Sequence, residues 1–207
     1  MGERKEAREA FLKEHAELLA EPEFQLVDLL KKYEMTIAAA ESCTGGLVSA
    51  KLVNVPGASA VFKEGFVTYS NKAKRKTLDV QKSTIRRDGA ISEQTAKEMA
   101  MGAAMMADTD MAVSTTGNAG PACEEGKPVG LVYIGVYCGG KVKAFEYRFE
   151  GDRNEIREQA AREALSLAEK TVLKLKEKKD KEAKPDKPEK NDKTEKTAKT
   201  EKPAKDR

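Results

Sequence analysis

The sequence is poor in the residues that build the most common catalytic and metal-binding groups. It has a single histidine, His15, and no tryptophan, and its three cysteines are widely spaced, at Cys43, Cys123 and Cys138. This pattern indicates neither a disulfide framework nor a zinc site, and it favours a reducing cytoplasm. A nucleophile activated by histidine would require His15, on a charged N-terminal segment, to fold back onto it.

Long apolar runs and charge of one sign are also missing. No apolar run is long enough to cross a bilayer, and the first twenty residues are charged throughout, unlike a signal peptide. The formal net charge is +3, and residues 178–207 alone hold 12 Lys and Arg against 8 Asp and Glu. The remainder is close to neutral, so the sequence predicts no nucleic-acid partner and no membrane partner.

The residues that are present divide the chain into three parts. Residues 178–207 interleave lysine with acids, prolines and threonines. That composition cannot bury a core, and it predicts a disordered tail. Residues 1–20 predict an N-terminal helical extension. Residues 21–177 have the size of one ordinary domain.

Within this domain, helical and strand-like patterns alternate. Residues 35–40 are a short apolar run typical of a buried strand, and residues 47–55 continue as a helix. Gly139 and Gly140 separate two strand-like segments and predict a hairpin, while Asp152 is placed to cap a long closing helix. The pattern predicts an α/β fold, a single layered domain with a mixed β-sheet flanked by helices.

The turn after residues 35–40 carries three candidate nucleophiles, Ser42, Cys43 and Thr44, directly before Gly45 and Gly46. Unpaired amides at the start of the following helix could hold a phosphate or a developing oxyanion, and glycine would let the backbone approach a ligand. A serine or threonine before a helix also commonly serves only as its cap. From this segment alone both interpretations stay open.

A serine at this turn needs a base, and the stretch TYSNKAK offers one that is not histidine. Tyr69 ends a strand, and Lys72, Lys74 and Lys76 open the next helix. A tyrosine and a lysine of lowered pKa, brought to Ser42, would form a proton-transfer group. The alternative is a solvated basic helix face.

A second glycine turn, GNAGP at residues 117–121, follows another apolar strand. Two such turns could lie on one edge of a sheet, where open α/β sheets bind ligands, although ordinary turn chemistry also accounts for them. Arg153 and Arg157 lie in the first turns of the last helix. They could hold an anion, but pairing with the nearby acids Glu150, Asp152 and Glu155 is the simpler expectation.

Taken in order, five segments resemble the C-terminal domain family of the competence/damage-inducible protein CinA, from about Phe24 to Lys174. They are AAAESCTGGLVSAKLVNVPGASAVFKEGFVTYSNKAK, GAISEQTAKEMAMGA, GNAGP, GKPVGLVYIGVY and EGDRNEIREQAAREAL. The resemblance implies a hydrolase with an α/β domain, often a homodimer, that deamidates nicotinamide mononucleotide to nicotinate mononucleotide and ammonia in pyridine-nucleotide recycling. The substrate is a small-molecule nucleotide, and the activity needs no metal or other cofactor.

The resemblance also implies roles for individual residues. The family's serine, tyrosine and lysine correspond to Ser42, Tyr69 and Lys74 as the catalytic group. The substrate-binding set would be Thr44, Gly45, Gly46, Gly117, Ala119, Gly120 and Arg153. The family more often has an apolar residue where Asn118 stands, which predicts a changed pocket polarity. The alternative function is a pyridine-nucleotide-binding or interaction protein of the same fold without turnover.

Overall fold

The computed structural model describes residues 16–182, with side chains from 17 to 178. His15 and most of the predicted N-terminal extension lie outside these residues. So does the predicted tail from residue 183 onward. The closing helix runs to Glu182, so the first five residues assigned to the tail are helical.

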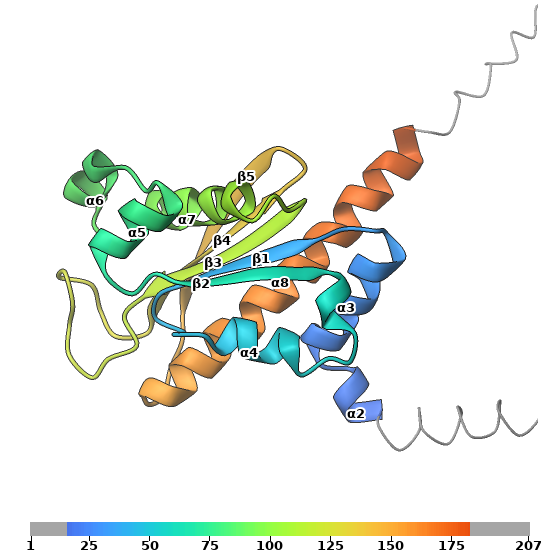
Figure 1. Ribbon diagram of the computed structural model, residues 1–207. Coiled ribbons are helices and arrows are strands. Elements are labelled where there is room, and N and C mark those ends of the chain that lie inside the picture. Colours follow the sequence, from blue (N-terminus) through green and yellow to red (C-terminus); the bar gives the residue numbers. More distant parts are fainter. Residues whose placement is uncertain (1–15, 183–207) are drawn as a thin grey trace, which may run out of the picture.

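A five-stranded mixed sheet forms the centre of the domain, in the order β2-β1-β3-β4-β5 (Figure 1). Parallel pairing joins β1 (Ile37–Glu41) to β2 (Phe62–Val67) and to β3 (Met111–Gly117). Antiparallel pairing joins β3 to β4 (Leu131–Cys138) and β4 to β5 (Lys141–Arg148) across the predicted Gly139–Gly140 hairpin. The predicted fold class is therefore confirmed.

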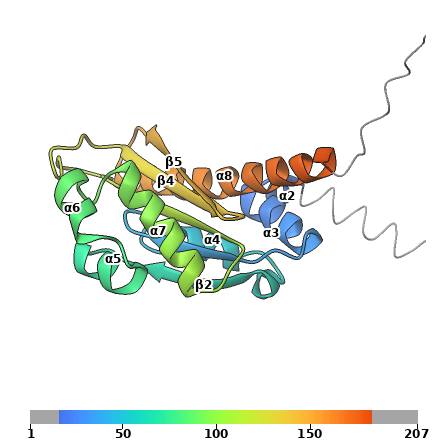
Figure 2. The ribbon, with the colours of Figure 1, turned by 90° about the horizontal axis from the view of Figure 1, so that it is seen from above.

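Helices cover both faces of this sheet, as the view from above also shows (Figure 2). One face carries α3 (Pro22–Lys32), α4 (Leu47–Val53) and α8 (Arg153–Glu182), with α2 (Ala16–Leu19) before them. The other carries α5 (Asn71–Leu78), α6 (Lys82–Asp88) and α7 (Glu93–Met106). A short 3-10 turn, η1 (Ala58–Ala60), precedes β2.

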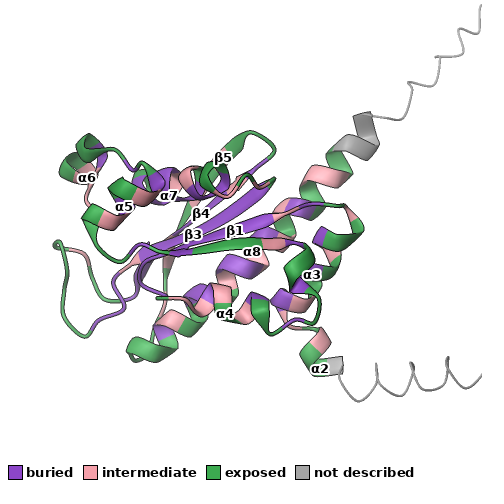
Figure 3. Ribbon diagram, in the orientation of Figure 1, coloured by how far each residue is buried: buried purple, intermediate pink, exposed green. Residues whose placement is uncertain are grey.

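The core lies on both faces of the central strands, and β1 and β3 are buried almost throughout (Figure 3). Small side chains dominate where α7 and α8 meet the sheet. Ala96, Ala100 and Ala103 on α7 and Ala160, Ala161 and Ala164 on α8 are fully buried. Small residues let the helix backbones approach the sheet closely, and this packing fixes the loops at the carboxyl ends of the strands.

Because β1, β2 and β3 are parallel, their carboxyl ends meet at one edge of the sheet. Glu41 at the end of β1 pairs with Val67 of β2 on one side and Thr115 of β3 on the other. The next two strands of the chain, β2 and β3, lie on opposite sides of β1. The carboxyl end of β1 is therefore the topological switch point, where open α/β sheets bind ligands.

Candidate functional site

The loops at this edge surround a cavity of about 320 Å³. Its walls come from the turns after β1, β2 and β3, from the connection between α6 and α7, from the loop before β4, and from the start of α8. The lining residues include Ser42, Cys43, Tyr69, Ser70, Asn71, Lys74, Ala90, Ile91, Thr116, Gly117, Ala119, Glu124, Glu125 and Arg153. The fold thus brings the two predicted loops, 39–46 and 68–74, to one place.

The central contact is between Lys74 and Ser42. Lys74 lies on α5, whose N-cap is Ser70, and its side chain points inward while its helix neighbours Lys72, Arg75 and Lys76 are exposed. The Nζ atom is 2.8 Å from Ser42 Oγ, and the Lys74 residue is only 1% exposed. The alternative of a solvated basic helix face therefore holds for Lys72, Arg75 and Lys76, but it is wrong for Lys74.

Two backbone carbonyls complete the surroundings of this amine. Nζ donates to the carbonyls of Thr68 at 3.0 Å and Tyr69 at 3.3 Å. A neutral lysine has two N–H donors and one lone pair, so it can donate to both carbonyls while its lone pair accepts the Ser42 hydroxyl proton. A protonated lysine can donate to all three oxygens. Both protonation states are therefore satisfied without a movement of the side chain.

Burial lowers the pKa of Lys74 from 10.5 to about 8, because an ammonium loses its hydration in this position. The negative charges of Glu125 and Glu124 act in the opposite direction and limit the fall. The neighbouring thiol of Cys43 behaves differently: burial raises its pKa to about 12, which keeps it protonated. Of the two adjacent candidate nucleophiles, Ser42 and Cys43, only Ser42 is hydrogen-bonded to the Lys74 amine.

Tyr69 contributes to this site through its backbone and at the rim. Its side chain is 63% exposed, and its hydroxyl accepts a hydrogen bond from Arg153 Nη2 at 3.2 Å. No hydrogen bond joins that hydroxyl to Ser42 or Lys74 among the described residues. The structure therefore places Tyr69 on the cavity wall, apart from the direct Ser42–Lys74 contact.

The buried carboxylate of Glu41 holds the turn that presents Ser42. Glu41 is fully buried, and its oxygens accept from the amides of Gly46, Val48 and Ser49 at 2.8, 3.1 and 2.8 Å. They also accept from the hydroxyls of Thr44 and Ser49, both at 2.7 Å. The expectation that amides at the start of this helix could bind a phosphate or oxyanion is wrong for these three, because Glu41 already occupies them.

Thr44, Gly45 and Gly46 lie behind the cavity instead of lining it. The Thr44 hydroxyl is fully buried and bridges Glu41 to Thr115 of β3, at 2.7 Å. Gly45 and Gly46 have φ values of 62° and 106°, a left-handed conformation that glycine adopts without strain. These residues shape the turn behind Ser42.

The two arginines of α8 hold the loops and do not pair with their acidic neighbours. Arg157 donates to the carbonyls of Cys43 at 3.2 Å and Thr44 at 2.9 Å. Arg153 donates to the Gly120 carbonyl as well as to Tyr69. The expected surface pairing with Glu150, Asp152 and Glu155 is therefore wrong. Asp152 instead caps α8 as predicted, accepting from the amides of Asn154 and Glu155 at 2.7 and 2.9 Å.

The second glycine turn forms another part of the wall. Gly117 and Ala119 line the cavity, whereas Gly120 reaches the site through its carbonyl on Arg153. The Asn118 side chain is buried and donates to the carbonyls of Ala122 and Lys127 at 2.9 and 3.1 Å. Asn118 therefore organises the following loop and does not change the polarity of the cavity, contrary to the expectation.

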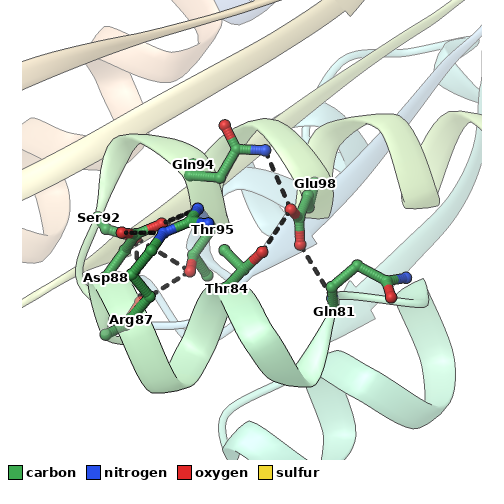
Figure 4. A network of polar contacts seen from close by, with 9 residues as sticks. Gln81, Thr84, Arg87, Asp88, Ser92, Gln94, Thr95 and Glu98 are labelled. Carbon is green, nitrogen blue, oxygen red and sulfur yellow. Dashed lines mark hydrogen bonds and ion pairs between the residues drawn. The ribbon is translucent and has the colours of Figure 1, made fainter.

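The α6–α7 connection supplies Ala90 and Ile91 to the cavity wall, and neither was predicted as a site residue, although both lie in the segment GAISEQTAKEMAMGA. Glu98 of α7 holds the start of α6, the helix before this connection, by accepting from the Gln81 amide at 2.9 Å and the Thr84 hydroxyl at 2.7 Å (Figure 4). Thr116 of β3 donates to the Ala90 carbonyl at 2.7 Å. Glu124 and Glu125 were likewise missed as site residues, because they lie in a loop without a recognisable motif.

Among residues 16–182, no three side chains of the His, Cys, Asp or Glu type are grouped so that they could hold a metal ion. In the same part of the chain, no helix has both the length and the apolar character needed to cross a membrane.

The fold and the site define a layered α/β protein with a buried serine–lysine pair at the switch point of its sheet. The model of the CinA C-terminal domain family matches residues 19–172. The chain therefore belongs to this family. A "CinA-like protein" of Kosmotoga olearia is 52% identical over 151 residues, which cover 72% of this chain and 37% of that protein. The chain thus spans about a third of the length of the curated relatives it matches.

Solved structures agree with this assignment. A CinA superfamily protein from Klebsiella pneumoniae superposes with a TM-score of 0.73 and 32% identity, covering 74% of this chain and 97% of that one. The competence/damage-inducible protein CihA from Agrobacterium tumefaciens has a TM-score of 0.70 and 38% identity, covering 74% and 96%. The likeness extends over the described domain.

Replacing Glu41 by alanine should destabilise the domain by about 3 kcal/mol, because buried amides and hydroxyls lose their acceptor. Urea unfolding of Glu41→Ala measures this change. Glu64→Ala, an exposed carboxylate on β2, is the matched control and should stay within about 0.5 kcal/mol of the unaltered protein. Equal stability of the two variants would contradict a capping role for Glu41.

The lowered pKa of Lys74 predicts a pH-dependent stability. Between pH 8 and 10.5 the unfolded chain holds the Lys74 proton and the folded protein releases it, so the native state gains stability as pH rises. Relative to Lys74→Met, the unaltered protein should gain about 3 kcal/mol across this window. Unfolding at pH 7.5 and 10 measures it, with the exposed Lys72→Met as control. A difference independent of pH would show that the amine titrates normally.

Proposed function

We propose that the domain is an amidohydrolase that deamidates nicotinamide mononucleotide to nicotinate mononucleotide and ammonia. The observation that carries the proposal is the 2.8 Å contact between the buried Lys74 amine and Ser42 Oγ. A serine hydroxyl is inert unless a base takes its proton, and a desolvated lysine is such a base near neutral pH. Membership of the CinA family supports the choice of substrate.

The first half of the reaction follows from these two groups. Lys74 Nζ takes the Ser42 proton while Oγ attacks the carboxamide carbon, giving a tetrahedral intermediate. The C–N bond then breaks, and the Lys74 ammonium returns its proton to the departing nitrogen, which leaves as ammonia. This leaves an ester between Ser42 and the nicotinoyl group.

The second half uses the same groups in reverse order. Lys74 takes a proton from a water molecule, the hydroxide attacks the ester carbon, and the proton passes back to Ser42 Oγ as nicotinate mononucleotide is released. Arg153 at the cavity wall would meet the phosphate. The hydroxyl of Tyr69, oriented by Arg153, would position the substrate.

A nucleotide-binding protein without turnover is the second candidate. The exposed position of Tyr69 favours it, because no contact ties that hydroxyl to the serine–lysine pair. It predicts saturable binding of the mononucleotide without release of ammonia.

Ammonia release from nicotinamide mononucleotide should fall by about 10³-fold or more in Ser42→Ala, because the nucleophile is lost. Cys43→Ala is the matched control, since its protonated thiol is an adjacent candidate nucleophile. It should keep activity within about threefold, the scale of a modest packing change. Ammonia can be followed with a coupled enzyme assay. A fully active Ser42→Ala variant would refute the nucleophile assignment.

The value of kcat/KM should rise with pH and level off above about 8, because only the neutral Lys74 amine accepts the serine proton. At pH 7 about one lysine in ten is neutral, so the rate should be about a tenth of the plateau. Lys74→Arg, which cannot lose its proton, should be inactive at every pH. A flat profile between pH 6.5 and 9 in an active enzyme would rule out Lys74 as the base.

A further inference from the structure

The loop between Gly117 and Leu131 contributes two carboxylates to the cavity, Glu124 and Glu125. It is held in shape by hydrogen bonds. The Lys127 amide donates to the Glu124 carbonyl at 2.7 Å, and the Glu124 amide donates back to the Lys127 carbonyl at 3.3 Å. The Asn118 side chain holds the loop from inside through Ala122 and Lys127. The two carboxylates therefore project from a defined turn.

The conformation of this turn is unfavourable for a glutamate. Glu125 and Gly126 have φ values of 51° and 70°. Asn-Gly or Asp-Gly is the usual pair at such positions, and a longer side chain in the left-handed region costs about 1 kcal/mol. Glu125 Oε2 offsets this cost by accepting from the amides of Ala90 and Ile91 at 2.8 and 3.2 Å. The glutamate thus bridges two walls of the cavity and places a negative charge between them.

Glu124 differs from Glu125 because its carboxylate is free. It is exposed and lines the cavity, and within residues 16–182 it has no hydrogen bond or ion pair to its side chain. Its charge nevertheless reaches the serine–lysine pair, since Glu125 and Glu124 both raise the pKa of Lys74 against the effect of burial. A free carboxylate on the wall of a ligand cavity is available to a positively charged group.

When Lys74 is neutral, as the proposed reaction requires, Arg153 is the remaining positive side chain among the described residues of the cavity wall. Arg153 donates hydrogen bonds to the Tyr69 hydroxyl and the Gly120 carbonyl and forms no ion pair with Glu124 or Glu125 within the described residues. The cavity then offers one positive group and two negative groups from different loops. Such a wall fits a ligand that carries both signs of charge.

We propose that Glu124 and Glu125 recognise a positive charge on the heterocyclic ring of the substrate, so that the site selects an N-substituted pyridinium amide over a neutral ring of the same shape. This proposal rests on the proposed function, and it adds the positive charge of the ring as the feature by which the site distinguishes substrates. Glu124 acts through its free carboxylate. Glu125 acts through its charge and by fixing the loop.

The test compares nicotinamide mononucleotide with its reduced form, which has the same phosphate, ribose and carboxamide but an uncharged ring. Isothermal titration calorimetry measures Kd for both compounds, and ammonia is measured in parallel. Glu124→Gln and Glu125→Gln remove one charge each, and glutamine at 125 can still accept from the Ala90 and Ile91 amides. Glu64→Gln on β2 is the matched control outside the cavity.

The unaltered protein should bind the oxidised form more tightly. Each glutamine substitution should weaken that binding about fourfold, the effect of two unit charges about 5 Å apart in water, and leave binding of the reduced form unchanged. Glu64→Gln should change neither. Equal effects on both compounds, no effect on either, or no binding of either would overturn the proposal. Charge-selective binding without ammonia would uphold it and refute the amidase function, whereas ammonia without charge selectivity would do the reverse.

Discussion

The site depends on the burial of one lysine amine at the junction of three parallel strands. Lys74 reaches Ser42 after β1 and the carbonyls of Thr68 and Tyr69 after β2, and the amine is almost completely removed from water. A buried ammonium is costly, and the cost is relieved when the group gives up its proton. The same desolvation that strains the folded state therefore creates a base from a lysine, in a described region, residues 16–182, that contains no histidine.

The surrounding charges are arranged so that this amine remains the reactive one. Glu41 is buried next to Ser42 in sequence, but its carboxylate is turned onto the first turn of α4 and is fully occupied by amides and hydroxyls. It therefore stabilises the turn without forming an ion pair with Lys74, which would hold the amine in its charged form. The arginines of α8 bind backbone carbonyls, so they too fix loops without neutralising the acidic cavity wall.

The sequence predicted the fold and a lysine base for Ser42 from identifiable patterns, whereas the choice of Lys74 over Lys72 and Lys76 came from the resemblance to the CinA family. The apolar run before Ser42 and the Gly139–Gly140 hairpin are local patterns, and the lack of a usable histidine restricted the choice of base. What it could not reach depends on side-chain direction. In the sequence Glu41 reads as the first residue of the turn after a predicted strand, and only the folded structure shows that its carboxylate occupies the amides expected to bind a ligand.

The arginines show the same limit. Arg153 and Arg157 stand beside acids in the sequence, which suggests local pairs, yet the packing of α8 against the sheet directs them to Gly120 and to Cys43 and Thr44. No sequence pattern predicted Glu124 and Glu125 as cavity residues, because their position depends on how the 117–131 loop packs in the folded protein. The bend of the 117–131 loop toward the α6–α7 connection is a tertiary feature.

The position of α8 has a consequence for how the protein matures on the ribosome. Ser42, Tyr69 and Lys74 are synthesised early, but the carbonyls of the Ser42 turn are bound by Arg157, and Tyr69 is oriented by Arg153, more than eighty residues later. At a translation rate of 5–20 residues per second, about ten seconds pass between the synthesis of Lys74 and the synthesis of Arg153 and Arg157. The complete site can therefore assemble only late in translation, after all five strands of the sheet have left the exit tunnel.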